Sequence, residues 1–420
     1  MHSRIAGVCA AAVLATTACA PISAGLTTAP LPSASQARIA VPASVGGPAR
    51  PDRPITVTVT NGRLTEVNVT GPDGALEGTL SKDARIWVST LHSLEFGTSY
   101  SVKANAVDRW GTPTQTTADV VTLVASRRLH ASIAPTEGDI VGVGMPITVH
   151  FDRPVHGHDN RAAVESKLQV VSSTPVEGAW SWAGDRDVLY RPRSYWPGHA
   201  NITVRASLKG VHLSKSVWGQ GNVETHFQTG AAMVSSVNMN THELTVKRDG
   251  QVLRVIPITT GKPGFASRSG IKVIMSKERN RIMDAATGGT SKKDPEYYRL
   301  NVEYAMRITW TGEFLHAAPW SVYAQGHQNV SHGCTGMSTS NGAWFYANSR
   351  PGDVVSYTGS DRQVESGNGI TVWNVSWSDW LRGSALHGSS TGDGTSDGTT
   401  VPGGNPTGGA TPLPTDPVTA

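Results

Sequence analysis

Alternating apolar and polar residues dominate the chain from about residue 51 onward. Residues 55–60 alternate with a period of two, and the Asn61-Gly62 pair that follows is typical of a hairpin turn. The Pro-Ile-Thr-Val sequence that opens this strand recurs at residues 146–149. Short strands with frequent turn signals and no helical period predict two immunoglobulin-like β-sandwiches, over residues 51–125 and 126–230.

A third β-rich region is expected over residues 231–360. It opens with apolar alternation on both sides of an Asp249-Gly250 turn signal, which indicates another hairpin. One short helix is expected, where polar residues 338–341 precede the apolar stretch 343–346. The predicted fold class is therefore mainly β.

Three tryptophans follow the third region. Trp373, Trp377 and Trp380 are spaced four and three residues apart, so one face of a helix would carry all three. We interpret them as apolar anchors that dock a C-terminal segment, residues 361–382, onto the third region.

Both ends of the chain differ from its middle. Residues 1–19 begin with a charged stretch and continue with an apolar run that is too short to span a bilayer, a pattern typical of a signal peptide. Residues 20–50 are rich in Ala, Pro, Ser and Gly and predict a flexible tether. Residues 383–420 lack Lys, Arg and aromatic residues and predict a disordered tail.

The composition disfavours several classes of protein. With 420 residues the chain is long enough for several domains. Charged residues make up only 16%, and 45 Gly and 25 Pro disfavour a coiled coil or a long helical bundle. The formal net charge is +4 without any run of basic residues, so nucleic acid is not an expected partner.

The cysteines point to export and to one reactive thiol. Cys9 falls inside the leader, and Cys19 follows small residues that resemble a bacterial lipobox, although Thr16 stands where Leu is usual. Cys19 is therefore predicted to be the lipidated N-terminal residue, the alternative being an ordinary signal-peptidase cut nearby. With Cys19 lipidated, Cys334 is the only free thiol in the mature chain and no disulfide framework exists.

The strongest chemical signal is His316 followed, after fourteen residues, by Ser331-His332-Gly333-Cys334. A thiol, a neighbouring imidazole and a glycine are the parts needed for acyl transfer through a cysteine. The imidazole is expected to draw the thiol into a thiolate–imidazolium pair, and amides at the Cys334 turn would stabilise an oxyanion.

Two other interpretations use the same residue types. Cys334 could be an inert buried thiol, or His316, His327, His332 and Cys334 could bind zinc, although their spacing matches no common zinc pattern. His156 and His158 could form a second metal site, but histidines on a Gly-containing loop are more often solvated surface. We expect no metal and no organic cofactor.

The spacing of His316 from the Ser-His-Gly-Cys sequence, with Gly326-His327 between them, resembles the signature of the L,D-transpeptidase family of bacterial peptidoglycan enzymes. Actinobacterial members are similar over nearly the whole mature chain, with immunoglobulin-like modules ahead of a β-rich catalytic domain that contains a short helix. The resemblance implies an acyltransferase that joins tetrapeptide stems of peptidoglycan by 3→3 cross-links through a cysteine acyl-enzyme. It also implies that carbapenems acylate the enzyme and that the protein acts outside the cell membrane, held there by its lipid.

The resemblance assigns a role to each catalytic residue. Cys334 is the nucleophile and His316 the general base, whose imidazole is oriented by the main-chain carbonyl of Ala317. Ser331, His332 and Gly333 complete the signature, with His332 near the oxyanion site.

The resemblance also implies substrate contacts, from Tyr298 and Met283 on a lid, from Trp320 as a pocket wall, and from His327. One position departs from the family pattern, because Gly336 stands where Asn is usual. A changed efficiency, donor preference or inhibitor susceptibility is therefore expected.

Three alternatives to a transpeptidase stay open. With water as acceptor the same site would be an L,D-carboxypeptidase, and a cysteine endopeptidase or amidase would use the same pair of residues on another bond. A wall-binding module with a decayed catalytic region is the third, and Gly336 is its only hint in the sequence.

Overall fold

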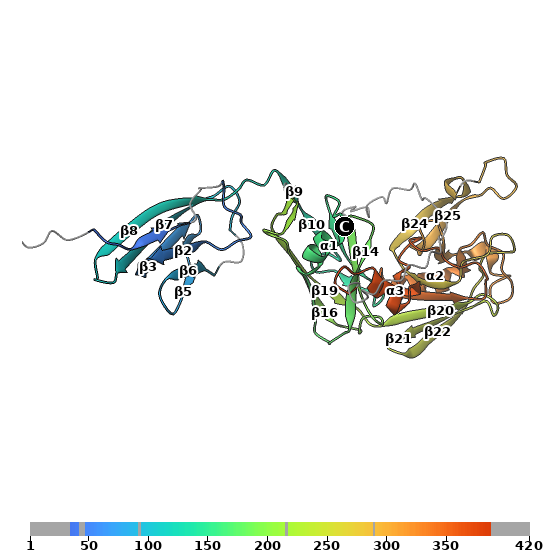
Figure 1. The fold of residues 1–420 in the computed structure, drawn as a ribbon. Coiled ribbons are helices and arrows are strands. Elements are labelled where there is room, and N and C mark those ends of the chain that lie inside the picture. The colour runs from blue at the N-terminus through green and yellow to red at the C-terminus, as the bar shows by residue number, and fades with distance from the viewer. Residues whose placement is uncertain (1–33, 42–46, 91–93, 215–216, 289, 388–420) are drawn as a thin grey trace, which may run out of the picture. The chain divides into compact units, whose positions relative to one another are not determined.

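In the computed structural model, residues 34–41, 47–90, 94–214, 217–288 and 290–387 are described (Figure 1). The chain divides into two compact units, one ending at Val124 and the other beginning at Ala125. The mainly β fold expected from the sequence is confirmed. Within the described part, no helix combines the length and apolarity needed to cross a bilayer. The predicted signal peptide and Cys19 lie outside the described residues.

The first unit contains two four-stranded sheets whose inward side chains form one core. Val57 and Trp87 come from one sheet, and Val102 and Ala104 come from the other. The first sheet has the order β1 (Arg38–Ala40), β2 (Thr56–Thr60), β6 (Ile86–Ser89), β5 (Gly78–Leu80). The second has the order β4 (Gly74–Leu76), β3 (Gly62–Gly71), β7 (Ser99–Asp108), β8 (Pro113–Val121).

Two expectations for this unit need correction. Asn61 does turn the chain, with φ 55°, but β2 and β3 enter different sheets and do not form a hairpin. The flexible tether expected over residues 20–50 was predicted to extend too far. Within that range β1 pairs with β2 in an antiparallel register, with Arg38 opposite Thr60. Edge pairing and burial of Ala37, 1% exposed, order this segment despite its tether-like composition.

The second unit begins with another β-sandwich. One sheet has the order β10 (Ala131–Ala134), β12 (Ile147–Phe151), β15 (Asp187–Pro192), β14 (Gly178–Ala183). The other has the order β11 (Ile140–Val141), β19 (Asn222–Thr229), β16 (Asn201–Ser207), β13 (Leu168–Ser172). A small third sheet joins β17 (His212–Ser214), β18 (Val217–Gly219) and β9 (Arg127–Leu129), and the helix α1 (His158–Glu165) follows β12. Aromatic side chains fill the core, among them Trp180, Tyr190 and Trp196.

Two further sheets follow in the same unit and enclose a core of their own. A mixed five-stranded sheet has the order β22 (Gln251–Pro257), β21 (Glu243–Arg248), β20 (Met233–Asn238), β28 (Val354–Thr358), β23 (Gly270–Val273). A four-stranded sheet has the order β24 (Ser276–Asp284), β25 (Arg299–Arg307), β26 (Phe314–Ala317), β27 (Thr335–Met337). The short 3-10 helices η1 (Ala285–Gly288) and η2 (Pro319–Ser321) lie in the connections.

The helix expected after residue 338 is present as α2 (Thr339–Asn348). Ser338 caps it, because its Oγ accepts a hydrogen bond from the N–H of Asn341. A Cβ at Gly342 would lie 3.1 Å from the Cβ of Ala317, so glycine lets the helix pack closely on β26. The helix thus supports the strand that carries His316.

The second sandwich and the two-sheet region meet at closely packed backbone. The N–H of Gly142 donates to Pro351 O, and that of Gly144 donates to Gly352 O, both at 2.8 Å. A Cβ on Gly142 would lie 2.1 Å from the nitrogen of Asp353, which only glycine avoids. These contacts explain why the two regions form one compact unit.

The tryptophan-rich segment differs from its prediction. Trp373 lies in η3 (Val372–Asn374), whereas Trp377 and Trp380 lie in α3 (Trp377–Arg382), because the backbone between them is extended at Val375. Trp373 Nε1 donates to Gly144 O, and Trp380 Nε1 donates to Ala179 O. The segment therefore docks largely on the second sandwich, and not on the two-sheet region alone.

The disordered tail was expected to begin at residue 383, but the first residues of that range are packed. Ala385 is 5% exposed, and its N–H donates to the buried carboxylate of Glu165 at 2.8 Å. The same carboxylate accepts from Trp182 Nε1 at 3.0 Å and from the Ser384 hydroxyl. Residues 383–387 therefore belong to the packed structure.

Candidate active site

His316 and Cys334 are brought together by two neighbouring parallel strands. His316 lies on β26 opposite Gly336 of β27, and Cys334 immediately precedes β27. Both side chains line one cavity of about 220 Å³, although only 6% of His316 and 8% of Cys334 is exposed. The two residues that the sequence selects as base and nucleophile thus line the same cavity.

The imidazole of His316 is fixed by its neighbour's backbone. Its Nδ1 lies 2.8 Å from the carbonyl oxygen of Ala317. With the proton on Nδ1 donated to that carbonyl, Nε2 keeps a free lone pair, as a general base requires. The ring of Trp320 stacks over the imidazole with a centroid distance of 6.0 Å.

The resting charges differ from the expected ion pair. Burial raises the pKa of the Cys334 thiol to about 11, although a hydrogen bond from the Phe314 N–H favours its thiolate. Burial also lowers the pKa of His316 below its usual 6.5. Both groups are therefore neutral at rest, because an enclosed site disfavours each charge. The thiol donates to Gly312 O at 3.6 Å.

The Ser331–Gly333 turn is held by hydroxyl groups. Ser331 Oγ donates to Cys334 O at 2.6 Å and accepts from the N–H of Gly333 at 3.1 Å. Ser267 Oγ donates to Gly333 O at 2.7 Å, a contact the sequence did not suggest. Gly333 has φ 121°, a conformation that glycine adopts readily.

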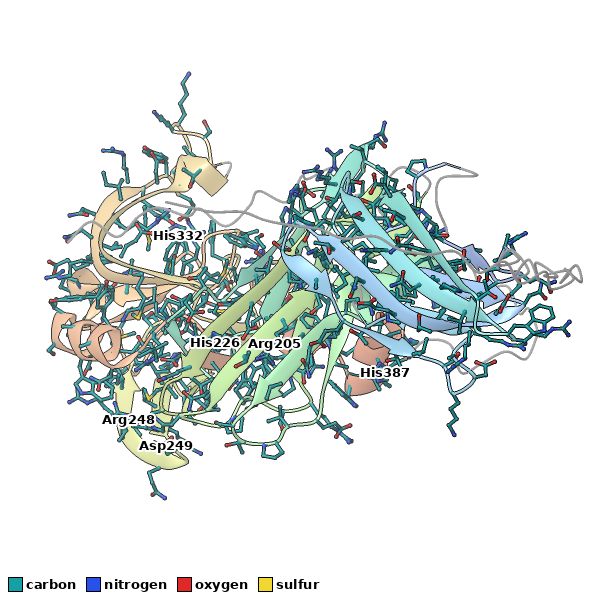
Figure 2. All side chains as sticks on the ribbon, turned by 90° about the vertical axis from the view of Figure 1, so that its left-hand side faces the viewer. Arg205, His226, Arg248, Asp249, His332 and His387 are labelled. Carbon is teal, nitrogen blue, oxygen red and sulfur yellow. The ribbon has the colours of Figure 1, made fainter. Side chains whose placement is uncertain are left out.

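His332 faces a carboxylate that sequence reasoning missed. Its Nε2 lies 2.6 Å from Glu296 Oε2, and that oxygen is 2.7 Å from Lys262 Nζ. Hydrogen bonds from Lys262 and His332 lower the pKa of Glu296. The rings of Phe265 and Tyr298 lie 4.7 and 4.9 Å from the imidazole. Figure 2 shows His332 beside the gold ribbon that contains β24 and β25.

The expected pocket residues divide into two groups. Met283, Tyr298 and Trp320 line the cavity, and burial raises the pKa of Tyr298 to about 12, so its phenol stays neutral. His327 is exposed and lies outside this set. Further lining residues that the sequence did not suggest include Leu300, Val302 and Tyr323.

Gly336 lies at the cavity with no room for a larger residue. A Cβ there would lie 2.9 Å from Ala318 Cβ and 3.1 Å from Thr259 Cγ2. Its backbone also exchanges two hydrogen bonds with Thr259, of 3.0 and 2.9 Å. The neighbours of position 336 thus occupy the space that an asparagine side chain would need.

The part of the chain that the structure describes contains no group of three or more His, Cys, Asp or Glu arranged to hold a metal ion. His156 and His158 instead lie 4.0 and 3.6 Å from carboxylate oxygens of Asp185 and Asp159. The zinc interpretation therefore gains no support.

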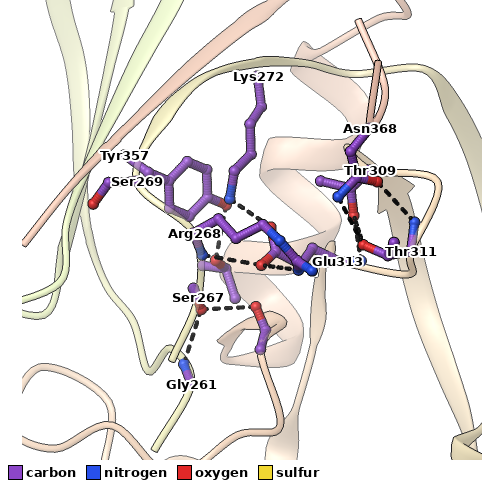
Figure 3. A network of polar contacts seen from close by, with 12 residues as sticks. Gly261, Ser267, Arg268, Ser269, Lys272, Thr309, Thr311, Glu313, Tyr357 and Asn368 are labelled. Carbon is purple, nitrogen blue, oxygen red and sulfur yellow. Dashed lines mark hydrogen bonds and ion pairs between the residues drawn. The ribbon is translucent and has the colours of Figure 1, made fainter. Parts of the chain in front are cut away.

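A buried cluster of charged side chains surrounds Glu313, the residue between Gly312 and Phe314 (Figure 3). Glu313 accepts from both Lys272 and Arg268. Sequence reasoning missed this cluster, because Lys272 and Glu313 are 41 residues apart in the chain.

Comparison with known proteins gives two family matches. Residues 48–212 match the family of bacterial Ig domains, and residues 233–356 match the L,D-transpeptidase catalytic domain. L,D-transpeptidase 2 of Mycobacterium tuberculosis is 34% identical over 339 residues, covering 80% of this chain and 81% of that protein. L,D-transpeptidase 5 of the same species is 32% identical over 354 residues, covering 82% and 76%.

A solved structure of an L,D-transpeptidase in complex with imipenem is 35% identical, covers 54% of this chain and 98% of that one, and has a TM-score of 0.47. The matches to the two curated proteins extend through the immunoglobulin-like and catalytic regions alike. This chain belongs to the L,D-transpeptidase family, whose members are cysteine-dependent acyltransferases.

Proposed function

We propose that this protein cross-links peptidoglycan as an L,D-transpeptidase, with Cys334 as nucleophile and His316 as base. One observation carries the proposal: both side chains line the same cavity, where Ala317 O lies 2.8 Å from Nδ1 of the imidazole. Met283, Tyr298 and Trp320 would contact the stem peptide from the cavity walls.

The first half-reaction forms a thioester. Nε2 of His316 takes the thiol proton as Sγ of Cys334 attacks the carbonyl carbon of the third residue of a tetrapeptide stem. The bond from that carbon to the nitrogen of the terminal D-Ala breaks, and His316 returns the proton to the leaving amine. Because burial favours the neutral form of both groups, His316 has to take the thiol proton for the sulfur to attack.

The second half-reaction transfers the acyl group. The side-chain amine of the third residue in another stem attacks the thioester, and His316 takes its proton. The carbon–sulfur bond breaks, sulfur regains a proton from His316, and a 3→3 amide remains. One amide bond has been exchanged for another, so the reaction needs no oxidant or reductant.

The test is intact-mass spectrometry of the mature full-length chain incubated with a disaccharide-tetrapeptide. The expected result is an adduct on the protein together with a dimer that has lost one D-Ala. Cys334→Ala is the control and should give neither. Shortened peptide without dimer would replace the proposal with an L,D-carboxypeptidase, and no adduct on folded protein with a reduced thiol would leave a wall-binding module.

We further propose that carbapenems acylate Cys334, since the carbonyl of the strained β-lactam ring is an acyl donor to the same thiol, and its C–N bond breaks as the thioester forms. A stoichiometric mass increase in the wild type that is absent from Cys334→Ala is expected. An increase that persists in the variant would contradict this assignment.

We also propose export and anchoring at the outer face of the membrane through a lipidated Cys19. The charged start, the short apolar run and the small residues before Cys19 support it. Cys19→Ala should move the protein from the membrane fraction to the soluble exported fraction. An unchanged distribution would contradict lipid anchoring while leaving the enzymatic proposal intact.

A further inference from the structure

The cluster behind Cys334 places full charges where an apolar core would be expected. Lys272 Nζ lies 2.5 Å from Glu313 Oε2, and the two side chains are 0% and 5% exposed. Arg268 Nη1 lies 3.1 Å from the other oxygen of Glu313. Burying an ion pair commonly gives no net stability relative to apolar residues of similar size. The cluster therefore calls for a role other than stabilisation.

Glu313 lies between two residues whose backbone contacts the sulfur. Gly312 O accepts from the thiol, and the Phe314 N–H donates to it. The turn that carries them is closed by Glu313 N–H to Thr309 Oγ1 at 2.8 Å and by Ile308 N–H to Glu313 O at 3.0 Å. Anchoring the Glu313 side chain therefore fixes the position of both backbone groups relative to Sγ.

Lys272 is also linked to the nucleophile through Tyr357. Its ammonium lies 3.8 Å from the ring centroid of Tyr357, whose hydroxyl lies 2.9 Å from Thr335 Oγ1. Thr335 directly follows Cys334 in the chain. Lys272 is thus linked to both sides of Cys334, through Glu313 to residues 312–314 and through Tyr357 to Thr335.

We propose that Lys272 and Glu313 are positioning residues for the nucleophile, which hold residues 312–314 against Sγ and set the electric field in which the thiol ionises. The proposal rests on the role of Cys334 in the proposed function. It adds two residues that touch neither the substrate nor the reacting atoms.

The two charges act on the thiol in opposite directions. The Lys272 cation lowers the pKa of Cys334, whereas the Glu313 carboxylate raises it. Other ionisable groups around Cys334 come from several elements of the fold: Arg307 of β25, His316 of β26, Tyr357 of β28, Tyr298 before β25, and His332 of the signature turn. Of these, Arg307 lowers the pKa of Cys334 alongside Lys272.

The test measures the alkylation rate of Cys334 by iodoacetamide between pH 6 and 9 in the mature chain. Lys272→Met should slow alkylation about tenfold at each pH, since one pKa unit changes the thiolate fraction tenfold. Glu313→Gln should accelerate it several-fold, and Lys272→Arg should restore a rate near that of the wild type. Lys277→Met is the matched control, because this half-buried ammonium donates to Tyr346 O and Ser349 O, away from the thiol.

Opposite effects of Lys272→Met and Glu313→Gln on the alkylation rate would distinguish a changed electric field at the thiol from a loss of folded structure. If both variants slow alkylation, or if neither differs from Lys277→Met, the cluster is only structural and the proposal is wrong. Should Lys272→Met fail to fold, Lys272→Arg and Glu313→Gln still test the proposal: the first should keep a rate near that of the wild type, and the second should raise it. Slower alkylation in Glu313→Gln would contradict the proposal. Alkylation needs no wall substrate, so a wild type that alkylates as expected but forms no acyl adduct would refute the proposed function alone.

Discussion

Two lysine–glutamate pairs flank the signature residues of this protein in opposite surroundings. Lys272 and Glu313 pair behind the sulfur, with 0% and 5% of their side chains exposed. Lys262 and Glu296 pair beside His332, with 32% and 39% exposed. Water screens the second pair and hardly reaches the first, so equal charges act with unequal strength. Exposure, and not residue type, decides which pair can influence the nucleophile.

The largest expected effect comes from the buried base itself. His316→Gln should lower the rate of acylation by a carbapenem by about 10² to 10⁴, because no other group shown at the thiol takes its proton. His327→Gln is the matched control, since His327 is exposed and lies outside the set that lines the cavity. Time-resolved intact mass measures both rates. Equal losses in the two variants would mean that the base is misassigned.

The next largest effect compares the two lysines in stability. Lys272→Met leaves Glu313 with Arg268 alone, and we expect the free energy of unfolding to fall by about 3 kcal/mol. Lys262→Met should give no measurable change, because its ion pair is exposed. Denaturant unfolding of both variants measures the difference. Similar losses would remove the distinction between the pairs.

The pH profile tests the neutral state of the catalytic pair. The lowered pKa of His316 and the raised pKa of Cys334, about 11, predict an acylation rate that is flat above pH 6.5 and falls as His316 becomes protonated at lower pH. Stability should also fall below pH 6.5, because the unfolded chain binds that proton more readily. Stopped-flow acylation and denaturant unfolding across this range give the two profiles. A rate that climbs tenfold per pH unit through neutrality would instead indicate that the thiol must ionise first.

The residues proposed here as catalytic could be selected from the sequence because their signal is local. Ser331 to Cys334 are consecutive, and His316 sits on the strand beside them, so one motif specifies most of the site. Lys272 and Glu313 are 41 residues apart, and their pairing depends on how two sheets pack. A lysine between Ile271 and Val273 looks like the solvent side of a strand, yet this one points inward.

The fold errors share a related cause. Residues 38–40 have no strong strand pattern, and pairing with the edge of β2 together with the burial of Ala37 orders them. The tryptophan spacing suggested one helix, but extended backbone at Val375 divides it and Arg191 offers its guanidinium to all three rings. Tertiary partners decided these segments, and a single sequence does not display them.

The smallest effect is expected at the exposed pair. Glu296→Gln keeps an oxygen for Lys262 and a polar partner for His332 while removing the negative charge. Because water screens that charge, the rate of acylation by a carbapenem should change by less than about threefold, and any difference should shrink as salt is raised. The rate is measured at low and high ionic strength. A loss above tenfold that salt does not reduce would show that Glu296 orients His332 for catalysis, and the contrast between the two pairs would then lie in their roles and not in their exposure.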